Sequence, residues 1–256
     1  MDEDLNWRVE EACSNAYPSP RELIYGGWLM RFSGGMIRRT GSVNPLRGRR
    51  EKPRSVVDLA ERLYGSLGHR PIFRIPQIAD DLDRELDERN YDHAAGSAVL
   101  FCDLAAASKV EVEEVIVEPD MTPHWHEESS RIGALSDREH AIFGIMVATI
   151  VLPKAFASIS IDGRVAAKAY GAIQDGLLVL EAVATDPGHR RRGHARKVVS
   201  GLMQWARTQG AEAACLQVLV DNLPALGLYK SLGFDRELYR YHYRMKLDAG
   251  ASKRKP

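Results

Sequence analysis

A run of basic side chains around one glycine is the part of this sequence best suited to chemistry. The segment ATDPGHRRRGHARK spans residues 184–197 and places histidines and arginines on both sides of Gly193. Three explanations fit such a cluster: a nucleic-acid contact, a solvated surface run, or a cradle for one small and highly charged ligand. The charge balance of the whole chain helps to separate them.

The chain as a whole is electrically neutral. Its 256 residues include 35 Lys and Arg against 35 Asp and Glu, and 45% of them are hydrophobic. A dedicated nucleic-acid binder usually carries a net basic field, because phosphate neutralisation supplies most of its affinity. We therefore expect a small anionic ligand and no nucleic-acid partner.

The order of strand, basic loop and helix has a physical consequence for anions. The chain turns at Pro187-Gly188, and the amides of Arg191–Arg196 then open a helix, where no preceding carbonyl accepts their hydrogen bonds. Such a helix start attracts anions through its N–H groups and its dipole. Gly193 and Ala195 leave room for a ligand, while neighbouring arginines add charged donors. The loop is thus predicted to hold a diphosphate, although it is neither a P-loop nor a G-x-G-x-x-G turn.

The spacing Arg190-x-x-Gly193-x-Ala195 resembles the acyl-CoA pyrophosphate loop of the GNAT N-acetyltransferase superfamily. The flanking segments LEAVATDP and LQVLVDNLPALGLYKSLGF strengthen the resemblance, which covers about residues 120–247. It implies a twisted, mixed and mainly antiparallel sheet flanked by helices, an α/β (α+β) fold. It also implies acetyl-CoA as co-substrate and direct attack on its thioester by a primary amine of a small molecule or a peptide.

The same resemblance implies which residues hold acetyl-CoA. The strand before the loop binds the pantetheine arm through its backbone, and the loop binds the diphosphate. The implied residues are Val183, Ala184, Thr185, Arg190, Arg191, Arg192, Gly193, His194, Ala195, Arg196 and Asn222. For Asn222, a simple helix N-cap is an equally good explanation.

Two residues are candidates for the chemical step. Tyr229 matches the family tyrosine, and a phenol with an ordinary pKa near 10 stays protonated at neutral pH, which suits an acid. The alternative is a core aromatic. Glu181 matches one position where family members hold a catalytic carboxylate, with a salt-bridged carboxylate as the alternative. Gln217 stands at the other such position and cannot accept a proton.

Other reactive residues suggest no further site. His124, His126 and Glu127 form the stretch HWHEE, but no third ligand follows at a suitable spacing, so a polar helix start is expected and no metal. The three cysteines, at positions 13, 102 and 215, are scattered. Their pattern indicates no disulfide framework and favours a cytoplasmic protein. No apolar run reaches the length of a membrane span, so we expect no membrane partner.

Hydrophobic periodicity and turn residues predict the elements that position these side chains. Residues 120–248 are expected to form two helices, three strands with turns at Asp162-Gly163 and Asp175-Gly176, a helix, a strand, a helix and a last strand. Ser136 and Glu139 predict a capping box, and Gly210 and Gly233 mark helix ends.

The first part of the chain has weaker signals. Residues 1–105 are expected to hold a hairpin, helices and strands without an R-x-x-G-x-A loop, a smaller and degenerate GNAT-like domain. LYGSLG at 63–68 echoes LYKSLG at 228–233, a hint of duplication and of a tandem GNAT protein. A linker or strand is expected over 106–119 and a disordered basic tail over 249–256.

Two rival functions remain open at the level of sequence. A sensor or scaffold would bind acetyl-CoA without turnover, and Gln217 is its best support. A nucleic-acid binder would use the basic loop together with RGRREKPR, but the neutral charge speaks against it. The sequence names no acceptor amine, and a homodimer is compatible with it.

Overall fold

The computed structural model describes residues 2–34, 37–108 and 110–246, so the expected tail at 249–256 lies outside the described residues. Within them the chain forms two compact units. The larger unit comprises Met1–Pro18 and Ala98–Leu238, and the smaller unit comprises Ser19–Ser97 and Tyr239–Pro256. These limits differ from the expected boundaries near residue 105, because the first helix belongs to the larger unit and the last strand reaches the smaller one.

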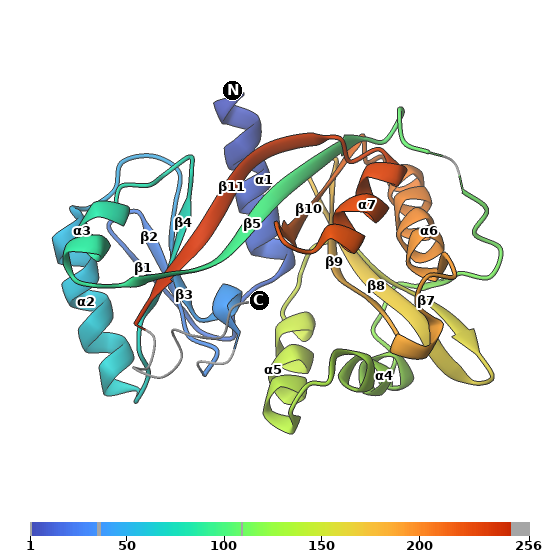
Figure 1. Cartoon of the computed structure of the whole chain (residues 1–256), viewed down its shortest axis with the longest axis horizontal. Coiled ribbons are helices and arrows are strands. Elements are labelled where there is room, and N and C mark those ends of the chain that lie inside the picture. Colours follow the sequence, from blue (N-terminus) through green and yellow to red (C-terminus); the bar gives the residue numbers. More distant parts are fainter. Residues whose placement is uncertain (1, 35–36, 109, 247–256) are drawn as a thin grey trace. The chain divides into compact units, whose positions relative to one another are not determined.

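The larger unit contains all elements expected over residues 120–238 in the expected order (Figure 1). Two strands, β5 (Asp92–Asp103) and β11 (Arg236–Met245), contribute residues to both units. The other regular elements of the larger unit are α1 (Glu3–Ala16), β6 (Ile116–Glu118), α4 (Pro123–Gly133), α5 (Asp137–Ala148), β7 (Lys154–Ile161), β8 (Arg164–Gln174), β9 (Leu177–Thr185), η2 (Pro187–His189), α6 (His194–Thr208), β10 (Ala213–Leu219) and α7 (Leu223–Leu232).

Two tight turns join the central strands, as predicted. Asp162-Gly163 connects β7 to β8, and Asp175-Gly176 connects β8 to β9. All four residues have positive φ angles between 48° and 76°. This is the backbone shape of a two-residue turn that matches strand twist, and it is why an Asp-Gly pair predicts a hairpin.

Helix ends are also set by local sequence. Ser136 and Glu139 form the predicted capping box at the start of α5. Gly210 and Gly233 follow the ends of α6 and α7 with φ of +81° and +103°, which a side chain with a Cβ rarely adopts.

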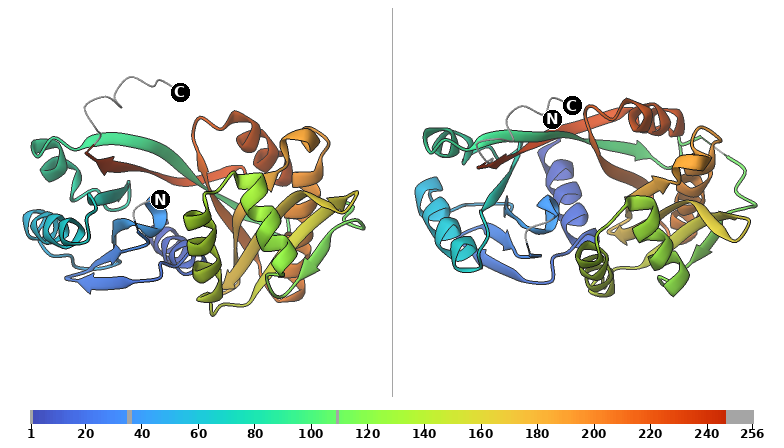
Figure 2. Two further views of the ribbon diagram at one scale, coloured as in Figure 1. Left: turned by 90° about the horizontal axis from the view of Figure 1, so that it is seen from below. Right: turned by 60° about the horizontal axis from the view of Figure 1, so that its bottom comes forward.

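Alternating strand residues face two different helical layers. One face of β7, β8 and β9 packs against α6 and forms a core of small and aliphatic residues that includes Ala157, Ala169 and Leu180. The other face carries aromatic rings, among them Phe156 and Tyr170, and is covered by α1 and α4 (Figure 2). A sheet buried on both faces explains why its strands read as nearly continuous apolar runs.

The smaller unit is also built around a sheet. Its elements are β1 (Glu22–Tyr25), β2 (Trp28–Arg31), η1 (Arg38–Thr40), β3 (Ser42–Pro45), α2 (Pro53–Ser66), β4 (Ile72–Pro76) and α3 (Asp83–Glu88). Strands β2 and β3 pair antiparallel, as the predicted hairpin requires, with η1 in the connection between them. Gly35, in the middle of the predicted hairpin, lies outside the described residues.

The strands form one hydrogen-bonded series of 11, in the order β1-β2-β3-β4-β11-β5-β10-β9-β8-β7-β6. Pairing is parallel between β3 and β4 and between β9 and β10. It is antiparallel in the pairs β1–β2, β2–β3, β4–β11, β6–β7, β7–β8 and β8–β9. This is the expected GNAT-like α+β fold with a mixed, mostly antiparallel sheet.

Two further properties follow from the described residues. Cys13, Cys102 and Cys215 are buried and take part in no disulfide among the described residues. None of the described helices has the length and apolar character needed to span a lipid bilayer.

Candidate functional site

The parallel pairing of β9 with β10 ends halfway along both strands. The paired residues run from Leu177 to Leu180 on β9 and from Ala213 to Leu216 on β10. Beyond that point β9 continues as Glu181–Thr185, which pairs only with β8 on its other side. The backbone groups of Val183, Ala184 and Thr185 lie beyond the register with β10 and can bond an extended ligand, as one strand bonds another.

An irregularity in β9 lies where this pairing stops. Tyr170 is opposite Glu181 and Lys168 is opposite Ala184, so β9 has one residue more than β8 in this interval. Ala182 has a φ of +51°, a conformation that costs an L-residue roughly 1–2 kcal/mol. Such a bulge bends its strand and is over-represented next to functional sites. It lies just after Leu180, the last residue of β9 in the register with β10.

The basic loop runs from this strand end into α6. Asp186 caps the short η2 turn, Arg191 has a φ of +61°, and Gly193 has a φ of +81° as the N-cap of α6. The helix thus begins at His194, three residues later than expected. The amides of Arg191 and Arg192 precede the helix, and its first-turn amides belong to His194–Arg196.

The loop residues fit an anionic diphosphate. No side chain caps the N-terminus of α6, so the first-turn N–H groups keep their hydrogen-bonding capacity for a ligand. A Cβ built on Gly193 meets no atom within 4 Å, which leaves open space at that position. Both ring nitrogens of His194 are buried without a partner among the described residues. The arginines that surround this space are exposed: Arg190, Arg191, Arg192 and Arg196.

An ion-pair network fixes the base of the loop. Arg131 on α4 bonds Asp186 and also Glu128, whose carboxylate lies 2.7 Å from the guanidinium. Glu128 in turn accepts the backbone N–H of Val165 at 3.0 Å. The Arg131 guanidinium, together with the Gly188 amide, lowers the pKa of Asp186 to about 2. Asp186 is therefore anionic at neutral pH and ties the loop to α4.

Removing this tie is expected to weaken acetyl-CoA binding moderately. Asp186→Ala deletes the ion pair to Arg131 and the 2.8 Å hydrogen bond from Gly188, so the loop must be ordered when the ligand binds. We expect a threefold to tenfold higher Kd, on the usual scale of a lost cap. The Kd of Asp186→Asn, which can keep the hydrogen bond from Gly188, should lie between the Kd of wild type and that of Asp186→Ala. Calorimetric titration with CoA checks this, and equal Kd values for all three proteins would contradict it.

Tyr229 and Glu181 are close enough to influence each other. Tyr229 is 7% exposed and Glu181 is 5% exposed. Burial, and then the negative charge of Glu181, raise the pKa of Tyr229 well above its ordinary value. The phenol thus keeps its proton throughout the neutral range. The candidate acid and the candidate carboxylate therefore influence each other electrostatically, and their roles in the chemical step stay predictions.

The other two polar candidates have defined places. The Asn222 carboxamide oxygen accepts the N–H of Ala225 at 3.3 Å, so the N-cap interpretation is confirmed, and a contact with acetyl-CoA stays a prediction. Gln217 is half-buried on β10, just past the last residue paired with β9.

Lys168 is a residue that the sequence analysis missed. It is 4% exposed on β8, opposite Ala184, and its ammonium lies 4.3 Å from the centroid of the Trp125 ring. No carboxylate of the described residues forms an ion pair with it. Burial lowers its pKa to about 7. The signal in the sequence was one lysine inside the apolar strand VAAKAYGAI.

Lys168 is expected to make stability depend on pH. Its pKa falls from 10.5 in the unfolded chain to about 7 in the folded protein, so between these values the unfolded chain binds more protons. The free energy of unfolding of wild type therefore rises from pH 7 to pH 10. At pH 7 the free energy of unfolding of Lys168→Met should exceed that of wild type by roughly 2–4 kcal/mol, and at pH 10 the two values should be similar. Urea unfolding at both pH values tests this. Lys230→Met, which replaces an exposed lysine, is the control and should have the same free energy of unfolding as wild type. The prediction is contradicted if Lys168→Met is no more stable than wild type at pH 7.

The HWHEE stretch is a helix start, as predicted. Thr122 caps α4 through the N–H of Trp125, and His126 contacts the carbonyl of His140 at 3.1 Å. Within the described ranges, neither His124, His126 nor Glu127 belongs to a group of three possible metal ligands.

Comparison with known proteins identifies a matching family model and several relatives. A family model described as "Probable histone acetyltransferase Rv0428c C-terminal" matches residues 7–244. A Bacillus subtilis protein described as "Uncharacterized N-acetyltransferase YobR" is 24% identical over 245 residues, covering 93% of this chain and 98% of YobR. The [ribosomal protein bS18]-alanine N-acetyltransferase of Salmonella typhimurium is 34% identical over 82 residues, covering 32% of this chain and 55% of that enzyme.

Solved structures share the fold. A GCN5-related N-acetyltransferase from Kribbella flavida has a TM-score of 0.68 at 16% identity and covers 96% of both chains. A tandem GNAT protein from the clavulanic acid biosynthesis pathway has a TM-score of 0.61 at 11% identity, covering 80% of this chain and 74% of the other. The family match extends over nearly the whole chain, and such membership implies the use of acetyl-CoA. The protein is a GNAT-family N-acetyltransferase and belongs to the Rv0428c C-terminal family.

Proposed function

We propose that this protein moves the acetyl group of acetyl-CoA to a primary amine by direct attack of the amine nitrogen on the thioester. One observation supports the proposal: β9 continues past the end of its pairing with β10, as Val183–Thr185, and leads through the basic loop into the uncapped start of α6. The extended pantetheine arm can bond to the edge of β9, and the diphosphate can bond to the start of α6. The two sites follow each other along the chain in the order that a CoA molecule requires.

Each part of the loop has its own task in holding the co-substrate. The backbone of Val183, Ala184 and Thr185 binds the pantetheine arm. The amides of His194–Arg196 bind the diphosphate, with Gly193 leaving the space that it needs. Exposed arginines around the loop attract the phosphates electrostatically, an effect that added salt will weaken.

Tyr229 and Glu181 divide the proton transfers between them. When bound, acetyl-CoA supplies an activated carbonyl and a thiol leaving group. Glu181 accepts, directly or through water, the proton that the attacking amine must lose. Tyr229 donates its proton to the sulfur as the C–S bond breaks and the C–N bond forms. The raised pKa of Tyr229 makes the phenol a weaker acid, and the same burial would raise the proton affinity of a thiolate formed beside it, which offsets this effect.

The acceptor is proposed to be an exposed primary amine of a small molecule or of a peptide. The peptide N-terminus comes first for testing, because a relative with partial coverage bears the name [ribosomal protein bS18]-alanine N-acetyltransferase. The amine is expected to approach as the neutral base, so activity should rise as pH increases toward the pKa of the amine.

The smaller unit is proposed to be a second, degenerate GNAT-like domain. The echoed segments occupy equivalent places, since LYGSLG ends α2 and LYKSLG ends α7. Their tyrosines, Tyr64 and Tyr229, are both buried, and burial raises both pKa values. The similarity to a tandem GNAT protein supports the same reading.

A sensor that binds acetyl-CoA without turnover is the second candidate, favoured by the amide of Gln217 where many family members hold a carboxylate. Thiol release, measured with a panel of amines and peptides, separates the two. Transfer to any amine above the hydrolysis rate supports the enzyme, with acetylation verified by mass spectrometry. Tight binding of acetyl-CoA without acetyl transfer to any acceptor of the panel would overturn the proposed enzyme function and favour the sensor.

A further inference from the structure

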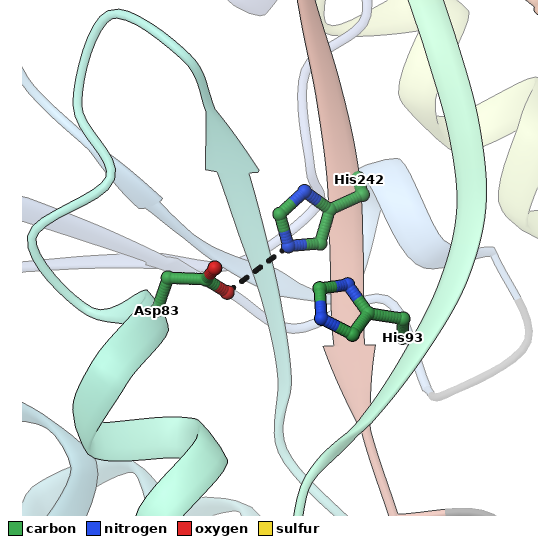
Figure 3. Close-up of side chains that lie close together, drawn as sticks. All are labelled: Asp83, His93 and His242. Atoms are coloured by element: carbon green, nitrogen blue, oxygen red, sulfur yellow. Dashed lines mark hydrogen bonds and ion pairs between the residues drawn. The ribbon is translucent and has the colours of Figure 1, made fainter.

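The smaller unit contains a cluster of metal-binding side chains outside the acetyl-CoA loop. Asp83 is the first residue of α3, His93 lies on β5, and His242 lies on β11, the neighbour of β5 in the sheet. One ligand atom from each of the three residues lies within 4.8 Å of the other two. Figure 3 shows both imidazole rings and the carboxylate converging on one point.

We propose that Asp83, His93 and His242 bind one divalent transition-metal ion. Two imidazoles and one carboxylate form a donor set that suits zinc and other first-row metals and leaves coordination positions for water or another ligand. Magnesium and calcium prefer sets composed of oxygen atoms, so they are not the expected ions. This proposal is independent of the proposed acetyl transfer, and it assigns a metal to a protein whose sequence predicted none.

The contacts within the cluster already resemble those of a metal site. Nε2 of His242 is 3.0 Å from Oδ1 of Asp83, and the rings of His93 and His242 have centroids 4.5 Å apart. Bound metal would replace the hydrogen that His242 shares with Asp83, and the neutral imidazole would then carry its proton on Nδ1. Ligand atoms about 2 Å from a common ion lie roughly 3–3.5 Å apart, so the side chains, whose ligand atoms now lie within 4.8 Å of one another, would rotate closer together on binding.

Arg244 orients the carboxylate without blocking it. Its Nε donates to Oδ1 of Asp83 at 2.7 Å, while its Nη1 donates to the Tyr91 carbonyl at 2.8 Å and to Asp87 at 3.2 Å. Oδ2 of Asp83 accepts no hydrogen bond from the described residues and is the oxygen available to an ion. A partner that fixes a ligating carboxylate is a regular part of metal sites.

The site is accessible from solvent. His93 is exposed, and Asp83 and His242 are half-buried. An ion can therefore enter without unfolding the unit, and His93→Ala should leave the fold intact. The competing explanation is a purely structural contact in which Asp83 links His242 and Arg244, and this explanation predicts no metal binding.

Titration of the full-length, tag-free protein with Co²⁺ and with Zn²⁺, after EDTA treatment and dialysis, tests the proposal. We expect one ion per chain, with visible Co²⁺ absorption, and a Kd raised at least about tenfold in His93→Ala and in His242→Gln, because even the loss of a residue that orients a ligand costs about this much. His69→Ala, which removes another histidine of the smaller unit, is the matched control and should bind as wild type does.

Thermal unfolding of each variant verifies that it is folded, and CoA titration verifies that the other site is unaffected. The proposal is overturned if wild type binds no stoichiometric Co²⁺ or Zn²⁺. It is equally overturned if His93→Ala binds either ion as tightly as wild type. Since the readout is metal binding, failure of this proposal leaves the proposed acetyl transfer standing, and the reverse also holds.

Discussion

Replacing Gly193 with glutamate is expected to weaken acetyl-CoA binding at least 100-fold. Gly193 is the N-cap of α6 with a φ of +81°, and no atom lies within 4 Å of a Cβ built on it. A glutamate side chain there would extend into the space proposed for the diphosphate and place a negative charge against it. The expected loss corresponds to roughly 2.7 kcal/mol of binding free energy. Calorimetric titration with CoA measures it.

Gly210 provides a matched control at the other end of the same helix. It also has a φ of +81°, and a Cβ built on it likewise meets nothing within 4 Å. Gly210→Glu therefore brings the same backbone strain and the same charge without approaching the loop. We expect wild-type CoA affinity in Gly210→Glu. A Gly193→Glu protein that binds CoA as tightly as this control would refute the proposed diphosphate site.

Replacing Tyr229 with phenylalanine is expected to reduce kcat by roughly 10²–10⁴, the usual contribution of a general acid. The ring remains, so its packing against Phe234, with ring centroids 6.0 Å apart, is preserved. Only the hydroxyl is lost, and with it the proton proposed for the departing sulfur. The Kd for CoA should change by no more than about twofold. Steady-state rates of thiol release, together with CoA titration, measure the two effects separately.

Tyr64 is the control for removing a buried phenol hydroxyl. It occupies the corresponding place at the end of α2 and donates to the Arg31 carbonyl at 2.7 Å. Tyr64→Phe should lower the free energy of unfolding by about 1 kcal/mol, the usual value of a hydrogen bond, and leave kcat unchanged. If Tyr229→Phe retained wild-type kcat, Tyr229 would be a packing residue, as one reading of the sequence already allowed.

Local signals predicted the elements of the larger unit well. The Asp-Gly turns, the Ser136–Glu139 capping box and the glycines after α6 and α7 each specify a backbone shape that depends on a few adjacent residues. The candidate acetyl-CoA loop could be proposed for the same reason, since its residues lie within one short segment. Even here the helix start was three residues off, because the turn at Gly193 has no side-chain cap to mark it.

Features that depend on distant residues could not be predicted from the sequence. The bulge at Ala182 is invisible in an apolar strand, since no residue type there demands a positive φ. The low pKa of Lys168 arises from burial beneath the Trp125 ring, 43 positions earlier in the sequence. The membership of α1 in the larger unit depends on contacts such as the bond from the Tyr170 hydroxyl to the Ala16 carbonyl.

The sequence by itself determined the family fold of the larger unit, and it selected the candidate acetyl-CoA loop, acid and carboxylate, whose roles stay predictions. Only the tertiary structure decided that Tyr229 and Glu181 are close together and that Asp83, His93 and His242 form one cluster. The physical reason is the range of the interactions. Turns, caps and helix starts are set by neighbours along the chain, whereas burial, charge coupling and ligand clusters exist only after remote segments have packed.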